Sequence, residues 1–103
     1  MAGKTVSEKS IEDYLRLRVK QAGGRAYKFV SPGNAGVPDR LAILPGGRIA
    51  FVELKAPGKK PTALQQKKIQ ELRSLGVLVT WADCREAVDR ILVELLAEKA
   101  GTQ

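Results

Sequence analysis

Two acidic residues lie at the ends of adjacent segments that have the alternating pattern of a β-hairpin. One strand is expected over residues 39–44 and the next over residues 48–55, joined by the strong turn signal Pro45-Gly46-Gly47. If this loop has three residues, the strand register places Asp39 opposite Glu53. Because side chains alternate along a strand, the two carboxylates then share one face of the hairpin, at the end of an apolar surface.

This placement has an electrostatic consequence. Directly opposed strand residues have Cβ atoms about 4.5 to 5.5 Å apart, a distance at which like charges destabilise the pair. A divalent cation such as magnesium or manganese would reverse the penalty, because hard cations prefer carboxylate oxygens. Such a cation polarises a scissile phosphate and lowers the pKa of a bound water. Lys55 follows Glu53 on the same face, within reach of that phosphate; the alternative is that Lys55 only neutralises two exposed acids.

A third acid is expected from a helix over residues 7–21, which Ser7 can cap. At about 100° per residue, both Glu8 and Glu12 fall on the apolar side of this helix, and Glu8 lies nearer the middle of the stripe. A carboxylate there is unfavourable unless a cation faces it. Either Glu8 or Glu12 is therefore a candidate for the site. The alternative is a first turn at the domain edge, where Glu8 complements the helix dipole.

A polar residue also occupies the inner face of a later helix. Thr62 can cap a helix over residues 63–75, whose inward stripe contains Gln65 together with Ile69 and Leu72. A glutamine on an apolar stripe indicates a polar site beneath it, although a hydrogen-bonded structural glutamine is the ordinary alternative.

The remaining pattern predicts the elements that position these residues. A strand is expected over residues 25–30, an apolar strand over 77–81, and a last amphipathic helix from 84 or 85 to about 99. The order α-β-β-β-α-β-α indicates an α/β fold with a mixed central sheet flanked by helices. A chain of 103 residues is the size of one domain, so we expect a single domain over 1–103, with its core at about 7–99 and a loose tail at 100–103.

Composition limits the partners and the chemistry. Eighteen Lys and Arg against eleven Asp and Glu give a net charge of +7 and a pI near 9.9, which favours an anionic partner such as nucleic acid. The absence of His and the single Cys84 exclude ordinary zinc spacing and His-dependent nucleophiles. No apolar run approaches the roughly 20 residues that cross a bilayer, and no secretory signal is evident, so we expect a cytoplasmic protein without a membrane partner.

The combined motifs resemble those of a known family. Gly36-Val37-Pro38-Asp39-Arg40, then Phe51-Val52-Glu53-Leu54-Lys55-Ala56-Pro57-Gly58, then Leu64-Gln65 are similar to the VRR-NUC domain of the PD-(D/E)xK nuclease superfamily. The resemblance covers residues 7–81 and implies a restriction-endonuclease-like αβββαβ core, here with an added C-terminal helix. Stand-alone members of similar size are phage or bacterial proteins, associated with homodimers that cut branched DNA such as four-way (Holliday) junctions.

The resemblance also implies roles for individual residues. Asp39 and Glu53 would bind Mg²⁺ or Mn²⁺, with the backbone carbonyl of Leu54 as a further ligand. Lys55 would be the superfamily's lysine and Gln65 its helix glutamine. For the family's helix-one acid the stripe geometry favours Glu8, with Glu12 as the second possibility. The expected reaction is metal-dependent hydrolysis of a DNA phosphodiester that leaves 5′-phosphate ends. The number of metal ions stays open.

Basic residues near the site are the expected DNA contacts. They are Arg40, Lys59, Lys60, Lys67 and Lys68. Because no aromatic residues are interleaved among them for base stacking, we expect recognition of DNA shape and backbone. Two other functions stay open: a catalytically inert nucleic-acid-binding module, and a nuclease of the same fold acting on linear DNA, single strands or RNA.

Overall fold

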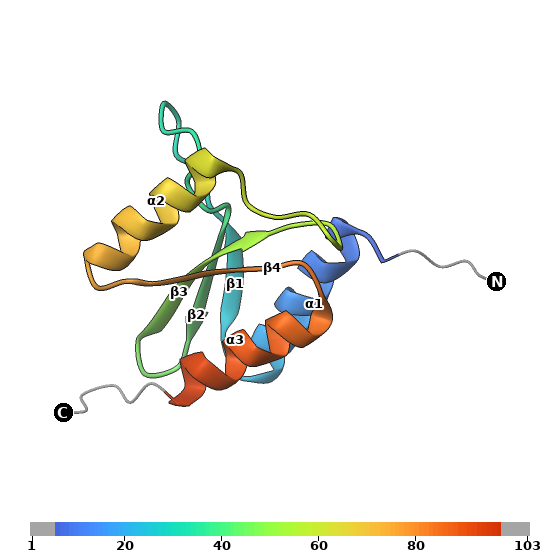
Figure 1. Ribbon diagram of the computed structural model, residues 1–103. Coiled ribbons are helices and arrows are strands. Elements are labelled where there is room, and N and C mark those ends of the chain that lie inside the picture. The colour runs from blue at the N-terminus through green and yellow to red at the C-terminus, as the bar shows by residue number, and fades with distance from the viewer. Residues whose placement is uncertain (1–5, 98–103) are drawn as a thin grey trace.

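The computed structural model describes residues 6–97, which form three helices and one four-stranded sheet (Figure 1). In chain order the elements are α1 (Glu8–Gln21), β1 (Arg25–Lys28), β2 (Arg40–Leu44), β3 (Arg48–Leu54), α2 (Ala63–Ser74), β4 (Leu78–Ala82) and α3 (Arg85–Ala97). This order confirms the α-β-β-β-α-β-α prediction. The expected helix end near residue 99 and the tail at 100–103 lie outside the described residues.

The sheet is mixed and has the strand order β1-β2-β3-β4. The first three strands are antiparallel, and β4 runs parallel to β3. Leu44 pairs with Arg48, which confirms the three-residue hairpin loop. Gly46 and Gly47 in this loop have φ values of +88° and +75°, a conformation that glycine adopts without a steric penalty.

The main core lies between one face of the sheet and two helices. Figure 1 shows α1 and α3 on this side and α2 on the other. The apolar stripe of α1, which consists of Ile11, Leu15 and Val19, is fully buried, and so is the inner face of α3. They pack against the alternate strand residues Ala42, Leu44, Ala50, Val52 and Leu54. The other sheet face, which carries Glu53, packs against α2 near β4.

Several element boundaries differ from the expectation by one or two residues. β1 ends at Lys28, before residues 29–30, and β2 begins at Arg40, so that Asp39 directly precedes it. β3 ends at Leu54, which leaves Lys55 as the first residue after the strand. Both acidic positions of the hairpin therefore lie just beyond the last β2–β3 pair, Arg40 with Val52, although Glu53 still pairs with Trp81 of β4.

Candidate active site

Glu53 is the centre of a polar cluster at the end of β3. Glu53 is only 5% exposed. The Lys55 Nζ lies 3.5 Å from the Glu53 Oε2, and the Gln65 Nε2 donates a hydrogen bond of 3.0 Å to the same oxygen. The structure therefore brings together three of the residues singled out from the sequence, from the end of β3 and the first turn of α2.

Asp39 lies opposite Glu53. Arg40 pairs with Val52, and continuing this register by one residue places Asp39 across from Glu53. The backbone here is held in place, since the Phe29 N–H donates to the Asp39 carbonyl at 2.7 Å. The Asp39 Oδ1 is buried and has no hydrogen-bond partner among the described residues. A buried carboxylate oxygen without a donor is a site that a cation can satisfy.

The electrostatics of Glu53 show the tension between the two carboxylates. Burial raises the pKa of the Glu53 carboxyl above its ordinary value, and the charge of Asp39 raises it further. The Lys55 ammonium acts in the opposite direction without overcoming the other two effects. The cluster is therefore short of positive charge, despite the excess of Lys and Arg in the whole chain.

Gln65 is fixed at both ends of its amide group. Its Oε1 accepts from the Thr62 N–H at 2.9 Å, and the Thr62 Oγ1 accepts from the Gln65 N–H at 3.1 Å, which together form a capping box at the start of α2. Because the amide oxygen is engaged in this cap, the NH₂ group faces Glu53. The local sequence Thr-x-x-Gln thus orients a side chain of the site.

The two acids of α1 are placed differently from the expectation. Glu8, expected near the middle of the apolar stripe, is exposed, because it is the first residue of the helix and the buried stripe begins at Ile11. Its charge nevertheless contributes to raising the pKa of Glu53. Glu12 is the partly buried acid, and its Oε2 lies 2.5 Å from the Arg40 Nη2.

Arg40 also differs from the expectation of a DNA contact. It is only 8% exposed, because strand alternation places it on the core face of β2 together with Ala42 and Leu44. With Glu12 as its partner, the guanidinium joins α1 to β2 and does not lie on the surface. A phosphate could reach it only if this ion pair opened.

Comparisons with known proteins show the family to which this chain belongs. No family model matches the sequence. Over 83 residues the chain is 51% identical to the "Putative nuclease p44" of Acyrthosiphon pisum secondary endosymbiont phage 1, covering 81% of this chain and 89% of that protein. A solved structure described as "VRR_NUC domain" superposes with a TM-score of 0.77 at 32% identity, covering 84% of this chain and 94% of that one. The chain belongs to the VRR-NUC family.

The four lysines expected near the candidate site have different surroundings. Lys59 and Lys60, in the loop between β3 and α2, are exposed, and so is Lys67 on α2. Lys68 is less exposed, and its Nζ lies 3.4 Å from the Glu71 Oε1. The first three are therefore available to a polyanion, whereas Lys68 has an acidic neighbour.

The residues present fit a magnesium or manganese ion. Among residues 6–97 no group of three or more His, Cys, Asp or Glu side chains lies close enough to hold a metal. Mg²⁺ does not need such a group, because it is usually held by one or two carboxylates and completes its shell with water and substrate oxygens. The partnerless Asp39 oxygen and the raised pKa of Glu53 are both features that a divalent cation would relieve.

Two features of the candidate site were not inferred from the sequence. The first is the role of Thr62 in orienting Gln65, which the capping-box spacing Thr-x-x-Gln could have indicated. The second is the Glu12–Arg40 pair. Alternation places Arg40 on the same face of β2 as Ala42 and Leu44, and an arginine buried on that face requires an acidic partner.

Proposed function

We propose that this protein is a metal-dependent DNA endonuclease that cuts branched DNA such as four-way junctions. The observation that carries the proposal is the buried Glu53 beside a partnerless Asp39 oxygen, with Lys55 and Gln65 at the same carboxylate. A buried acid whose pKa is raised by burial and by a neighbouring carboxylate, as that of Glu53 is, is typical of functional sites. The family membership and the name of the phage relative agree with a nuclease.

In this proposal Asp39, Glu53 and the backbone carbonyl of Leu54 hold magnesium or manganese. When bound, the ion polarises the scissile phosphate and makes water a stronger nucleophile. Gln65 keeps the Glu53 carboxylate in one orientation by donating to its Oε2. Because this oxygen also faces Lys55, the carboxylate is held from two directions before substrate arrives.

Lys55 acts through its positive charge. Its side chain is 17% exposed and lies at the edge of the cluster, where it can contact both solvent and a bound phosphate. An ammonium in this position orients the attacking water and stabilises negative charge that develops on the phosphoryl oxygens. Glu53 and Lys55 are thus assigned different tasks, although they are two residues apart.

We assign the acid of α1 to Glu8. The charge of its carboxylate raises the pKa of Glu53, whereas Glu12 forms an ion pair with Arg40. Glu8 is exposed and forms no ion pair with another side chain of residues 6–97, so it can turn toward substrate or a bound ion. Glu12 would then support the site by holding Arg40, the residue next to Asp39.

The proposed substrate contacts are the exposed lysines that follow the site, Lys59, Lys60 and Lys67, with Lys68 beside them. Their charges favour the phosphate backbone over individual bases. A homodimer would present two sites to the two strands of a junction. Tyr27 and Ile49, 54% and 45% exposed on the same sheet face, support such an interface. Sedimentation of a Tyr27→Glu/Ile49→Glu variant as a dimer would exclude this surface.

The test of function is incision of labelled DNA with and without Mg²⁺ or Mn²⁺. A panel of a four-way junction, linear duplex, single-stranded DNA and RNA is incubated with the protein and with Asp39→Asn, Glu53→Gln and Lys55→Gln. The proposal predicts metal-dependent incision of the junction that each substitution lowers at least 100-fold, by analogy with the loss of one charge-stabilising group. Full activity of any variant would refute the site, and preferred cutting of another polymer would refute the substrate.

A further inference from the structure

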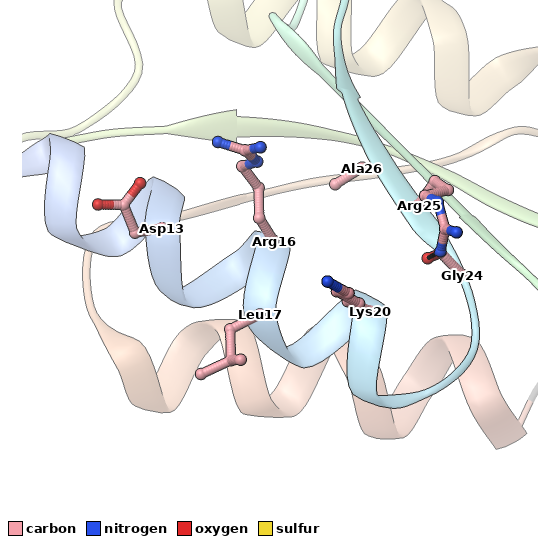
Figure 2. A pocket seen from close by; sticks show the side chains of 7 residues that line it. All are labelled: Asp13, Arg16, Leu17, Lys20, Gly24, Arg25 and Ala26. Carbon is pink, nitrogen blue, oxygen red and sulfur yellow. Dashed lines mark hydrogen bonds between the residues drawn. The ribbon is translucent and has the colours of Figure 1, made fainter.

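A basic groove lies between α1 and β1, apart from the polar cluster around Glu53. We call it the α1–β1 groove. Figure 2 shows Arg16 and Lys20 on α1 and Arg25 at the start of β1, on the two sides of the hollow. The hollow has a volume of about 260 Å³, and Gly24 and Ala26 complete its β1 side.

The groove carries excess positive charge. Arg16 and Lys20 are exposed, and neither forms an ion pair within residues 6–97. The acid at the rim, Asp13, is already 3.0 Å from the Lys9 Nζ. Arg16 and Lys20 of α1 and Arg25 of β1 therefore surround a space whose acidic lining residue, Asp13, already pairs with Lys9. Such an arrangement attracts a polyanion.

The Arg25 side of the groove is held rigidly. The Arg25 Nη1 donates to the Gly24 carbonyl at 2.8 Å, and Arg25 pairs with Ile43 in the sheet. Gly24 packs so closely on β2 that an added Cβ would lie 2.1 Å from the Ile43 carbonyl oxygen. The glycine thus allows the turn after α1 to press against the sheet, which fixes one wall of the groove relative to the strands.

The same strand connects the groove to the candidate active site. β1 runs from Arg25 to Lys28, and the next residue, Phe29, donates its N–H to the Asp39 carbonyl. Four residues of strand at about 3.3 Å each separate Arg25 from Phe29 by about 13 Å. A DNA duplex rises about 3.4 Å per base pair, so this distance corresponds to about four base pairs.

We propose that the α1–β1 groove binds backbone phosphates of duplex DNA about four base pairs from the bond that is cut. This inference rests on the proposed nuclease function and adds a second point of contact to it. The groove positions the arm of the substrate, while the cluster around Glu53 acts on the scissile phosphate. Its cations contact phosphates without reading bases, so the contact does not depend on sequence.

The test measures binding in EDTA, where cleavage cannot interfere. Fluorescence anisotropy of a labelled duplex is followed from low to high salt for the unmodified protein and for Arg16→Gln/Lys20→Gln. The matched control is Arg73→Gln/Arg90→Gln, which removes two charges beside β4, the opposite edge of the sheet. Circular dichroism confirms that each variant is folded at the temperature of the assay.

The groove predicts a specific change in salt dependence. Loss of two phosphate contacts makes the negative slope of log K against log salt shallower by about 1.8 and weakens binding about 10- to 30-fold at physiological salt. The control should keep the original slope. Equal slopes for the groove variant and the unmodified protein would overturn the proposal, and so would equal losses in both double variants, because these would indicate a general effect of net charge.

A second measurement locates the contact on the DNA. Neutral methylphosphonate linkages about four base pairs from the incised bond should weaken binding by the unmodified protein and leave the groove variant unaffected; additive losses would overturn the assignment. Groove-dependent DNA binding without incision in the presence of metal would refute the nuclease function and support DNA binding by the groove. No DNA binding by the unmodified protein would refute both.

Discussion

At the scale of single residues, Gln65 has two functions that can be separated. Its amide oxygen caps α2 through the Thr62 N–H, and its amide nitrogen donates to Glu53. The Thr62 hydroxyl contributes to the cap, and within residues 6–97 it forms no hydrogen bond with Glu53. A pair of substitutions at these two positions therefore distinguishes the stability of the helix from the orientation of the carboxylate.

We predict that Thr62→Ala and Gln65→Ala lower the free energy of unfolding by similar amounts, about 1 kcal/mol, because both remove part of the cap. Only Gln65→Ala should also lower kcat for incision, by about tenfold or more, since Glu53 loses its amide donor. Urea unfolding and single-turnover incision provide the two measurements. Equal kcat values for the two variants would show that the amide does not position Glu53.

The raised pKa of Glu53 predicts how metal-free stability depends on pH. A carboxyl whose pKa is higher in the folded state binds its proton more tightly there, so its stabilising effect is present at low pH and is lost as pH rises through the folded pKa. Without metal, Glu53→Gln should therefore be more stable than the unmodified protein at pH 7, and the difference should diminish toward pH 4. Thermal unfolding in EDTA across this range would contradict the account if the variant were less stable throughout.

At the scale of elements, the Glu12–Arg40 pair joins α1 to the start of β2. Both side chains are largely buried, at 21% and 10% exposure. Removing one partner from such a pair typically lowers stability by about 3 kcal/mol, since the other charge stays buried alone. Glu12→Gln and Arg40→Gln should each show this loss in chemical denaturation. The double variant Glu12→Leu/Arg40→Met should recover most of it; additive losses would mean that the two residues act independently.

The loop before Asp39 depends on a glycine that touches α2. Gly36 has φ of +86°, and an added Cβ would lie 2.8 Å from the Leu64 Cγ. Gly33 has φ of +83° in the same loop, but nothing lies within 4 Å of its Cβ position. The two positions therefore share the backbone requirement and differ in packing.

We predict that Gly33→Ala and Gly36→Ala both lose about 1 to 2 kcal/mol of stability from the left-handed backbone conformation. Gly36→Ala should lose more, and its incision rate should fall, because the loop must move away from the helix that carries Gln65. Denaturation and initial rates measure the two effects. Equal behaviour of the variants would indicate that contact between this loop and α2 has no part in assembling the site.

The order of elements and the hairpin register could be predicted from periodicity and turn residues. The alternation of residues 39–44 and 48–55 with a Pro-Gly-Gly turn is a local signal, and the observed pairing of Leu44 with Arg48 follows from it. The exposure of Glu8 could not be predicted, because helix periodicity gives the direction of a side chain but not how far the sheet extends beneath the first turn. The Glu12–Arg40 pair required both alternation in β2 and the packing of α1 on that face.

At the scale of the whole molecule, the charge of the chain and the charge of the site are opposite in sign. The net charge is +7, yet the Lys55 ammonium does not offset the effects of burial and of Asp39 on Glu53. The fold separates the two, with carboxylates at the end of β3 and cations on the surrounding loop and on the α1–β1 groove. Among residues 6–97 no helix is long and apolar enough to span a membrane.

This separation suits a protein that attracts a polyanion over a wide surface and reacts with it at one place. Long-range positive potential speeds the encounter with DNA, and it is screened by salt. The acidic cluster, in contrast, would repel a phosphate unless a divalent cation occupied it. The account of function therefore depends on cation binding by Asp39 and Glu53.

Isothermal titration of Mn²⁺ or Mg²⁺ into the protein tests this dependence most directly, with Asp39→Asn and Glu53→Gln beside it and Glu94→Gln, on the exposed side of α3, as a control. We predict saturable binding by the unmodified protein and the control, and at least a tenfold loss of affinity in both site variants. The titrations are made with and without duplex DNA. Undiminished ion binding by the site variants would contradict the account, and so would no ion binding by the unmodified protein in either condition.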